Sequence, residues 1–362
     1  MRSLTIGIVG ATGVVGQTAL DILGDGSLAL QIKEVRAFAS AASVGKRLSW
    51  GSRSVTVEPT ELDALAQCDA VLFASEADIS KRFIPELTSR GVLCVDKSSA
   101  FREDSAVPLV VPEVNGKLLS STALKKRPLV ANPNCCTTPL VMVLDLLRRE
   151  FGLKRVIVST YQSVSGAGKP GLEVLEEEAR QFFTAQDLSV KPSRAFPKSI
   201  AFNVMPFVAK ILPNGDTDEE QKIIFETRKI LDMAELPVEA TSVRVPTFVG
   251  HAESVTVETD KPVDLAKLES LIASSKGMMC VPNLNPGSVS ANPESDDAPD
   301  IAFFPTPRES QGRDEVLVGR LRTAKVFAHG VSLWLVSDNL RKGAALNALQ
   351  VVEACAKDGF FD

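Results

Sequence analysis

Residues 4–16 read LTIGIVGATGVVG, and this stretch decides how the rest of the chain is interpreted. The apolar run at 4–9 predicts a buried β-strand, and the residues from Val14 onward have the spacing of a helix. Gly10, Gly13 and Gly16 lie between the two, where glycines let a pyrophosphate approach the free N–H groups of a helix N-terminus. The loop therefore predicts a dinucleotide-binding site; the simpler alternative is a tight strand-to-helix turn without a ligand.

The residues after this loop repeat the same alternation of strand and helix. Further apolar runs stand at EVRAFAS (34–40), SVTVEP (54–59), DAVLFAS (69–75), VLCVD (92–96) and LVAN (129–132), with amphipathic stretches between them. This rhythm is typical of a parallel sheet in a Rossmann-type domain. A helix is expected from Thr137, with Thr138 as its candidate cap and Pro139 in its first turn.

From Lys154 the pattern changes to longer alternating strands, KRVIVSTY, SVRVPTF, HAESVTVETD and EVLVGRLRT, separated by helices such as DEEQKIIFETRKILD. The fold class predicted is α/β, with a Rossmann-type dinucleotide-binding domain and an α+β catalytic domain built on a large mixed sheet. We expect the first domain to cover 1–134, completed by a C-terminal helix at about 338–362, and the second to cover 135–337. The stretch 281–300 is expected to be an extended surface loop.

Composition excludes several classes of protein. A chain of 362 residues with 44% hydrophobic residues, 23% charged residues and a net charge of −5 is an ordinary globular sequence without a basic block. No apolar run of about 18 residues could cross a bilayer, and the first residues lack the pattern of a secretion signal. We therefore expect a cytoplasmic protein that binds a small molecule, with no membrane or nucleic-acid partner.

The six cysteines are scattered and include no CxxC pair, so the sequence predicts reduced thiols and no metal site. For NAD, an acidic residue is expected near the end of the second strand, but this end reads AFASAASVGKR (37–47). Ser40 and Ser43 can instead donate hydrogen bonds to a 2′-phosphate, and Lys46 or Arg47 can add positive charge, which favours NADP. The alternative is that these side chains only solvate a loop. A short-chain dehydrogenase is excluded because Tyr161 is the only tyrosine and has Ser165 four places on, where that mechanism needs lysine.

Cysteine and histidine candidates follow from position. ANPNCCTTP (131–139) ends a strand and begins a helix, and a helix N-terminus lowers the pKa of a thiol. Position alone does not separate Cys135 from Cys136, nor a nucleophile from a buried structural cysteine. His251 begins a strand and is the leading acid–base candidate, whereas His329 is expected to be a packed core residue.

Four charged residues complete the candidate set. Arg244 alternates with apolar neighbours in a strand and points into a cleft or to the surface. Glu219 and Lys222 share one helical face, where a weak surface ion pair is the simpler interpretation, and Arg102 is similarly ambiguous. Together these charges could bind a carboxylate, an amine and a phosphate.

Seven segments in order along the chain resemble the aspartate-semialdehyde dehydrogenase family: GIVGATGVVG, NPNCCTTP, YQSVSGAGKPG, FNVMPF, EEQKIIFETRKIL, RVPTFVGHAESV and SDNLRKGAALNA. The cysteine motif and RVPTFVGH are the most specific. The resemblance implies that Cys135 is the nucleophile, Gln162 orients the intermediate and His251 is the acid–base group. It further implies that Arg244 binds the substrate α-carboxylate, Glu219 its amine, and Arg102, Asn134 and Lys222 the phosphate.

For the cofactor, the resemblance points to Gly10, Thr12, Gly13, Val14, Val15, Gly16, Ser40, Ser43, Ser165, Gly166 and Asn339. The implied reaction is NADPH-dependent reduction of L-4-aspartyl phosphate to L-aspartate 4-semialdehyde, on the route to lysine, methionine, threonine and diaminopimelate, by a homodimer or a dimer of dimers. Ala42 departs from the family, which often has Arg there. The alternatives are an N-acetyl-glutamyl-phosphate reductase, whose cysteine motif has Gly where this chain has Asn134, and a redox sensor that binds NADP without turnover.

Overall fold

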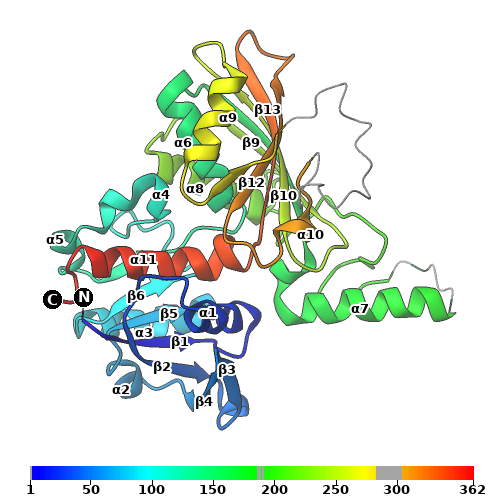
Figure 1. The fold of residues 1–362 in the computed structure, drawn as a ribbon. Coiled ribbons are helices and arrows are strands. Elements are labelled where there is room, and N and C mark those ends of the chain that lie inside the picture. Colours follow the sequence, from blue (N-terminus) through cyan, green and yellow to red (C-terminus); the bar gives the residue numbers. More distant parts are fainter. Residues whose placement is uncertain (1, 186–188, 190, 283–303) are drawn as a thin grey trace. The chain divides into compact units, whose positions relative to one another are not determined.

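The structure is a computed structural model that describes residues 2–185, 189, 191–282 and 304–362. The chain forms two compact units, Met1–Cys135 with Gly343–Asp362, and Cys136–Lys342. Figure 1 shows the elements of both units, coloured along the sequence. Apart from its first two residues, the surface loop expected at 281–300 lies outside the described residues.

The first unit is built on a seven-stranded sheet. Its order is β3 (Arg47–Trp50), β4 (Arg53–Pro59), β2 (Ile32–Ala39), β1 (Leu4–Val9), β5 (Ala70–Phe73), β6 (Leu93–Asp96) and β7 (Leu129–Ala131). Every neighbouring pair is parallel except the β3–β4 hairpin. From the central strand β1, the sheet continues through β2 and β4 on one side and through β5, β6 and β7 on the other, which confirms the Rossmann-type sheet.

Helices α1 (Val14–Asp25) and α11 (Leu346–Lys357) contact each other and share one apolar core with the strands. Ile6 and Leu72 belong to this core, and so does Leu349 of α11, although it follows them by more than 270 positions along the chain. On the opposite face of β1, Gly7 faces Cys68, which follows α2 (Leu62–Leu65). Helix α2 in turn contacts α3 (Ala77–Ser89). Three short elements link β6 to β7: α4 (Pro112–Asn115), η2 (Gly116–Leu119) and α5 (Ser121–Leu124).

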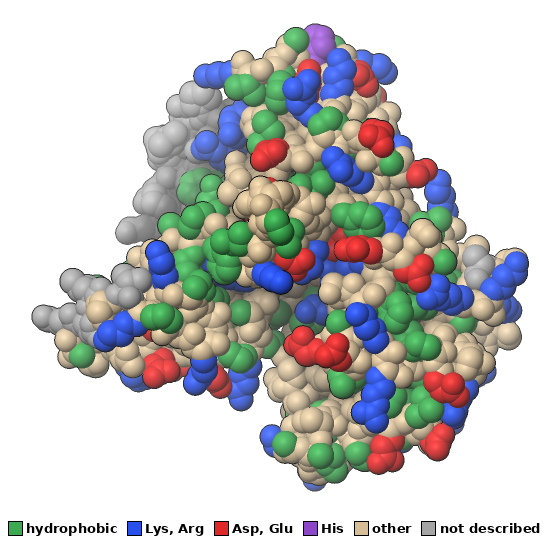
Figure 2. Space-filling view, turned by 180° about the vertical axis from the view of Figure 1, so that it is seen from behind, with side chains coloured by type: hydrophobic (Ala, Val, Ile, Leu, Met, Phe, Trp, Pro, Cys, Tyr) green, Lys and Arg blue, Asp and Glu red, His purple; other side chains and the backbone are tan. Residues whose placement is uncertain are grey.

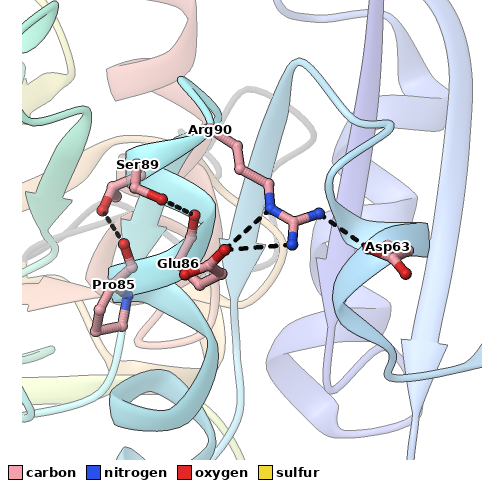
Figure 3. A network of polar contacts seen from close by, with 6 residues as sticks. Asp63, Pro85, Glu86, Ser89 and Arg90 are labelled. Carbon is pink, nitrogen blue, oxygen red and sulfur yellow. Dashed lines mark hydrogen bonds and ion pairs between the residues drawn. The ribbon is translucent and has the colours of Figure 1, made fainter.

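Arg90, directly after α3, ties that helix to α2. Its guanidinium donates to Asp63 over 2.9 Å and to Glu86, one turn earlier on α3, over 3.2 and 3.3 Å (Figure 3). Ser89 Oγ donates to the Glu86 carbonyl over 2.7 Å. All these contacts are exposed and contribute little to stability, and burial of Ile84 and Leu87 holds α3 on the sheet.

The second unit contains a six-stranded mixed sheet. Its order is β11 (Met278–Cys280), β12 (Val316–Thr323), β13 (Gly330–Ser337), β10 (His251–Glu258), β8 (Arg155–Gln162) and β9 (Val238–Arg244). The outer pairs β11–β12 and β8–β9 are parallel, and the inner pairs are antiparallel. The predicted large mixed sheet is therefore confirmed. Helices α6 (Thr137–Phe151), α8 (Asp218–Leu231) and α9 (Leu265–Ser274) pack on it and on one another.

The remaining helical elements of this unit connect the strands: η3 (Val164–Ala167), α7 (Gly168–Ala185) and α10 (Pro307–Ser310), while the π-turn η4 (Arg341–Ala345) leads into α11. Figure 1 shows α7 as a long helix, and α7 contacts the preceding η3. Helix α8 begins with a full capping box, in which Thr217 and Glu220 satisfy each other's backbone N–H groups. Its position was predicted from DEEQKIIFETRKILD.

Two local predictions are wrong. Helix α6 begins at Thr137, as expected, but its cap is Cys136 and not Thr138, which lies inside the first turn beside Pro139. Proline is tolerated there because the first-turn N–H groups have no intrahelical partner. His329 is not a core residue of a strand: it is partly exposed in the bend before β13, because the β12–β13 chain reversal falls on those residues.

No helix among the described residues is long and apolar enough to span a membrane. On the face in Figure 2, Lys and Arg side chains are interspersed with Asp and Glu. That face offers no single-sign patch of the kind that binds nucleic acid.

Candidate functional site

In the glycine loop of the first unit, positions 10 and 16 have no room for a side chain. A Cβ on Gly16 would lie 2.3 Å from the carbonyl oxygen of Gly10, and one on Gly10 would lie 2.6 Å from that of Ala74. Gly10 also has φ +81°, a conformation that favours glycine. Gly13 caps α1 without a side-chain hydrogen bond, so no side chain occupies the place where the first-turn N–H groups point.

This turn fits a dinucleotide. Thr12 lies in the turn, and Val14, Val15 and Gly16 begin the helix, so their N–H groups form the N-terminus available to a phosphate. At the end of β2, Ser40 caps the short helix η1 (Ala41–Ser43); Ser40 is exposed and Ser43 is buried. The sequence from Ala39 to Arg47 holds no carboxylate that would repel a 2′-phosphate. The residues present therefore fit NADP.

Cys135 follows β7 and is partly exposed, whereas Cys136 is fully buried. A Cβ at Gly343 would lie 2.9 Å from Cβ of Cys135 and 3.0 Å from its carbonyl oxygen, so the C-terminal segment presses its backbone against this cysteine. Sequence reasoning missed Gly343, although it stands in the conspicuous RKGAA segment. The π-turn around it is a feature often found at functional sites.

Arg102 and Asn134, the two predicted phosphate residues of the first unit, are 7% and 6% exposed, which excludes an ordinary surface role. Arg102 Nη2 donates to the carbonyl of Lys97 over 2.6 Å. The nearby Asp96 is fully buried and accepts hydrogen bonds from Ser80 and Ser98. Burial raises the pKa of Asp96, against the opposing effect of these hydrogen bonds and of the Arg102 charge.

In the second unit, His251 begins β10, as predicted, and is 1% exposed. Its Nδ1 accepts a hydrogen bond from the backbone N–H of Ser163 over 3.0 Å. Its Nε2 is buried and has no hydrogen-bond partner among the described residues. A ring nitrogen of His251 and the Sγ of Cys136 lie within 4.8 Å of each other. Because Cys136 is bonded to Cys135, the covalent neighbour of the proposed nucleophile lies beside the imidazole.

Arg244 ends β9 and is 7% exposed, so it is not the surface arginine that was the simpler interpretation. Its Nη1 donates to the carbonyl of Ser163 over 2.7 Å. A Cβ at Gly166 would lie 2.7 Å from this Nη1 and 3.4 Å from Nε2 of His251. The absence of a side chain at Gly166 therefore lets the Arg244 guanidinium and the His251 imidazole both lie close to its backbone.

Glu219 is 8% exposed and accepts a hydrogen bond from Gln162 Nε2 over 3.1 Å. Thr160 Oγ1 donates a hydrogen bond to Oε1 of the Gln162 amide over 3.0 Å. Lys222 is partly exposed and lies closer to Asp218 (2.5 Å) than to Glu219 (3.9 Å). The ion pair considered for Glu219 and Lys222 is therefore present but long, and Glu219 is buried, because its Oε1 accepts from buried Gln162.

Asn339 and Ser165 form a buried polar cluster. Asn339 Oδ1 accepts from the N–H of Gly250 over 2.9 Å, which fixes the orientation of its amide. Its Nδ2 donates to Ser165 Oγ over 2.9 Å. Ser163 Oγ joins them, 3.0 Å from Ser165 Oγ and 3.3 Å from Asn339 Oδ1. Sequence reasoning did not single out Ser163, although it lies in the motif YQSVSGAG.

Within the second unit, hydrogen bonds and close contacts therefore connect seven of the predicted site residues, with Ser163 and Thr160 as intermediates. The seven are Gln162, Ser165, Gly166, Glu219, Arg244, His251 and Asn339. A buried cation, a buried carboxylate and an unpartnered imidazole nitrogen can bind a small zwitterion and exchange a proton with it. Lys222 stands on the same helix as Glu219, and its Nζ lies nearer to the carboxylate of Asp218 than to that of Glu219.

Comparison with known proteins gives two family matches. The semialdehyde dehydrogenase NAD binding domain matches residues 5–122, and the semialdehyde dehydrogenase dimerisation domain matches residues 144–342. The chain is 38% identical to the aspartate-semialdehyde dehydrogenase of Aquifex aeolicus and 36% identical to that of Rickettsia bellii, each over 98% of both chains. A crystal structure of aspartate semialdehyde dehydrogenase II complexed with ASA, from Vibrio cholerae, superimposes with a TM-score of 0.89 at 34% identity over 99% of both chains.

Proposed function

Because this chain belongs to the aspartate-semialdehyde dehydrogenase family, we propose that it reduces L-4-aspartyl phosphate to L-aspartate 4-semialdehyde and phosphate through a thioester on Cys135. The observation that carries this proposal is the close approach of the buried Arg244 guanidinium and the buried His251 imidazole to the backbone of Gly166. Products of this chemistry serve amino-acid biosynthesis, on the route to lysine, methionine, threonine and diaminopimelate.

The cysteine and its anion-binding residues perform the first step. The thiolate of Cys135 attacks the acyl carbon, a C–S bond forms, and phosphate leaves with the electrons of the C–O bond. Arg102, Asn134 and Lys222 bind that phosphate. Arg102 and Asn134 are buried, so their charge and amide act at low dielectric, where they stabilise an anion better than in water.

The substrate's own charges determine its orientation. Arg244 binds the α-carboxylate through two parallel hydrogen bonds, and Glu219 binds the α-amine. Gln162, which is positioned by its hydrogen bond to Glu219, orients the acyl group. His251 exchanges a proton with the oxygen of the tetrahedral intermediate as the thioester is converted to aldehyde. A buried carboxylate at position 219 favours a substrate with a free amine over an acetylated one.

NADPH supplies the hydride when bound. Gly10, Thr12, Gly13, Val14, Val15 and Gly16 would hold its pyrophosphate, Ser40 and Ser43 its 2′-phosphate, and Ser165, Gly166 and Asn339 its nicotinamide end. We also propose that residues 1–134 with 338–362 serve as the NADP-binding domain, and 135–337 as the catalytic and dimerisation domain.

The chain carries a dimerisation domain at 144–342, and its ligands are small molecules. We further propose a cytoplasmic enzyme that assembles as a dimer or a dimer of dimers. Ile157 on β8, 42% exposed, and the Tyr161–Trp334 ring pair, with centroids 5.3 Å apart, provide apolar surface on the mixed sheet for such pairing. Sedimentation velocity at several concentrations distinguishes the two assemblies.

The direct test is the reverse assay, with purified protein, aspartate semialdehyde, phosphate and NADP, followed by the absorbance of NADPH. Turnover that depends on phosphate is expected. N-acetyl-glutamate semialdehyde is the matched control, and faster turnover of that compound would replace the proposed substrate. A protein that bound NADP but turned over neither aldehyde would be a sensor.

A further inference from the structure

Ser163 makes two different contacts with one nitrogen of His251. The backbone N–H of Ser163 lies 3.0 Å from Nδ1, and the side-chain Oγ of the same residue lies 3.1 Å from it. Both residues are buried: Ser163 is fully buried, and His251 is 1% exposed. Among the described residues, these are the hydrogen-bond partners of the imidazole ring, because its Nε2 has none.

The backbone contact determines where the resting ring carries its proton. A peptide N–H can only donate, so Nδ1 must accept, and a neutral imidazole then carries its proton on Nε2. Nε2 lies on the side of Gly166, 3.4 Å from where a Cβ on that residue would stand. In this tautomer, His251 can donate a hydrogen bond there, but it has no lone pair on Nε2 with which to remove a proton.

The proposed chemistry requires the other states of the ring. To act as an acid, His251 must be an imidazolium, with protons on both nitrogens. When its Nε2–H bond breaks and an O–H bond forms on the intermediate, the ring is left neutral with its proton on Nδ1. In both states Nδ1 carries a proton and acts as a hydrogen-bond donor. The backbone N–H of Ser163 is also a donor, so it cannot accept this hydrogen bond.

The hydroxyl of Ser163 can accept that proton. Its own hydrogen can then be donated to Asn339 Oδ1, 3.3 Å away, or to Ser165 Oγ, 3.0 Å away. The N–H of Gly250 keeps Asn339 Oδ1 oriented as an acceptor. One residue therefore offers a donor for the resting tautomer and an acceptor for the two states used in proton transfer.

We propose that Ser163 is a positioning residue, whose backbone sets the resting tautomer of His251 and whose hydroxyl, backed by Asn339, stabilises the states with a proton on Nδ1. The proposal rests on the proposed acid–base role of His251. Other charged or titratable groups lie on the surrounding elements: Arg244 on β9, Glu253 on β10, Cys136 at the start of α6, Glu219 and Lys222 on α8, and Asp338 after β13. Any of them would affect the ring in wild type and in a Ser163 variant alike.

The test uses Ser163→Ala and Ser163→Thr in the full-length protein. Alanine keeps the backbone donor and removes the acceptor, whereas threonine keeps both. NMR of protein labelled with ¹⁵N-histidine reports the tautomer and protonation of each ring directly. The chain has only two histidines, so His329 serves as an internal control and His251→Asn assigns the signals.

In wild type at neutral pH, the Nε2–H tautomer of His251 is expected. In Ser163→Ala, the imidazolium fraction of His251 near pH 6 should be lower by roughly 2- to 10-fold, the effect of one hydrogen bond, with His329 unchanged. The maximum of kcat against pH should move to lower pH, and kcat should fall by a similar factor, while KM changes little. Ser163→Thr should restore the NMR signature even if its Tm is reduced.

An Nδ1–H tautomer in wild type, or an alanine variant whose imidazolium fraction matches wild type, would overturn the proposal. The NMR readout needs no turnover. If the wild-type protein fails the reverse assay, the proposed function fails, and the ¹⁵N spectra still decide whether Ser163 controls the ring.

Discussion

The Nε2 amide of Gln162 donates to Oε1 of Glu219 over 3.1 Å, and neither residue is more than 8% exposed. A carboxylate buried to this extent needs hydrogen-bond donors, and Gln162 supplies one from the end of β8. Gln162 in turn accepts a hydrogen bond from Thr160, so two consecutive hydrogen bonds orient the Glu219 carboxylate. The proposed amine-binding group is therefore oriented before any substrate arrives.

Glu219→Gln should raise KM for aspartate semialdehyde by about 10- to 100-fold, because an amide cannot match a charged hydrogen bond to an ammonium group. Glu220 is the matched control. It is equally buried, but its carboxylate accepts from the N–H groups of Thr217 and Ser242. Glu220→Gln should lower stability by about 1 kcal/mol in thermal unfolding and leave KM unchanged. Equal KM effects in both variants would remove Glu219 from the substrate site.

Cys135→Ser should abolish turnover, whereas Cys136→Ser should keep a substantial part of it. Cys135 is partly exposed, whereas Cys136 is fully buried at the N-cap of α6. The reverse assay gives the activities, and circular dichroism checks that both variants fold. Comparable losses in two folded variants would mean that the thioester assignment is unsupported.

The other thiols should resist alkylation at neutral pH. Burial raises the pKa of Cys280 to about 11 and those of Cys68 and Cys355 to about 12, and it also raises the pKa of Cys94. Only the thiolate reacts, so at pH 8 on the order of one Cys280 in a thousand is reactive, and its labelling should rise about tenfold per pH unit towards pH 11. Peptide mass spectrometry after brief iodoacetamide treatment should find Cys135 modified first. Equally fast labelling of Cys280 at pH 8 would contradict this order.

The cofactor preference should depend on the end of β2. Ser40→Asp places a carboxylate at the exposed cap of η1, where it would repel a 2′-phosphate, so Kd for NADPH should rise roughly 10-fold or more. The Kd for NADH should change little, and titration of intrinsic tryptophan fluorescence measures both. If wild-type protein bound NADH and NADPH equally, Ser40 and Ser43 would not recognise the phosphate, and Ala42 would be the first position to examine.

Local patterns in the sequence were sufficient to predict both sheets. Strands such as Leu4–Val9 and helices such as α8 carry a hydrophobic period and capping residues that act within a few positions, so their type could be read directly. His251 at the start of a strand was predicted in the same way. The fold class followed because strand and helix alternate in the first part of the chain and strands lengthen in the second.

Burial and side-chain partners could not be predicted, because they depend on residues far apart in the sequence. Arg244 and Glu219 looked like surface charges on a strand and a helix, and only the pairing of β8 with β9 and the packing of α8 bury them. Gly343 approaches Cys135 across more than 200 positions. Ser163 escaped notice because its importance lies partly in a backbone N–H, which every residue except proline has.

The last prediction concerns Arg244, whose buried guanidinium can bind an α-carboxylate with two parallel hydrogen bonds while Nη1 also contacts the Ser163 carbonyl. Lysine offers a flexible point charge without this planar geometry. Arg244→Lys should therefore lower kcat/KM for aspartate semialdehyde by roughly 30-fold to several thousandfold, equivalent to about 2 to 5 kcal/mol. The Kd for NADPH should stay near wild type.

Arg228 provides the matched control for Arg244, because it is a partly buried arginine of the same unit whose Nε donates to the carbonyl of Leu236 over 2.7 Å. Arg228→Lys should lower the Tm slightly and leave kcat/KM near wild type, since its partner is structural backbone. If Arg244→Lys behaved in the same way, Arg244 would be a structural arginine. The α-carboxylate contact would then have to be withdrawn, and an amino-acid substrate would lose its main anchor.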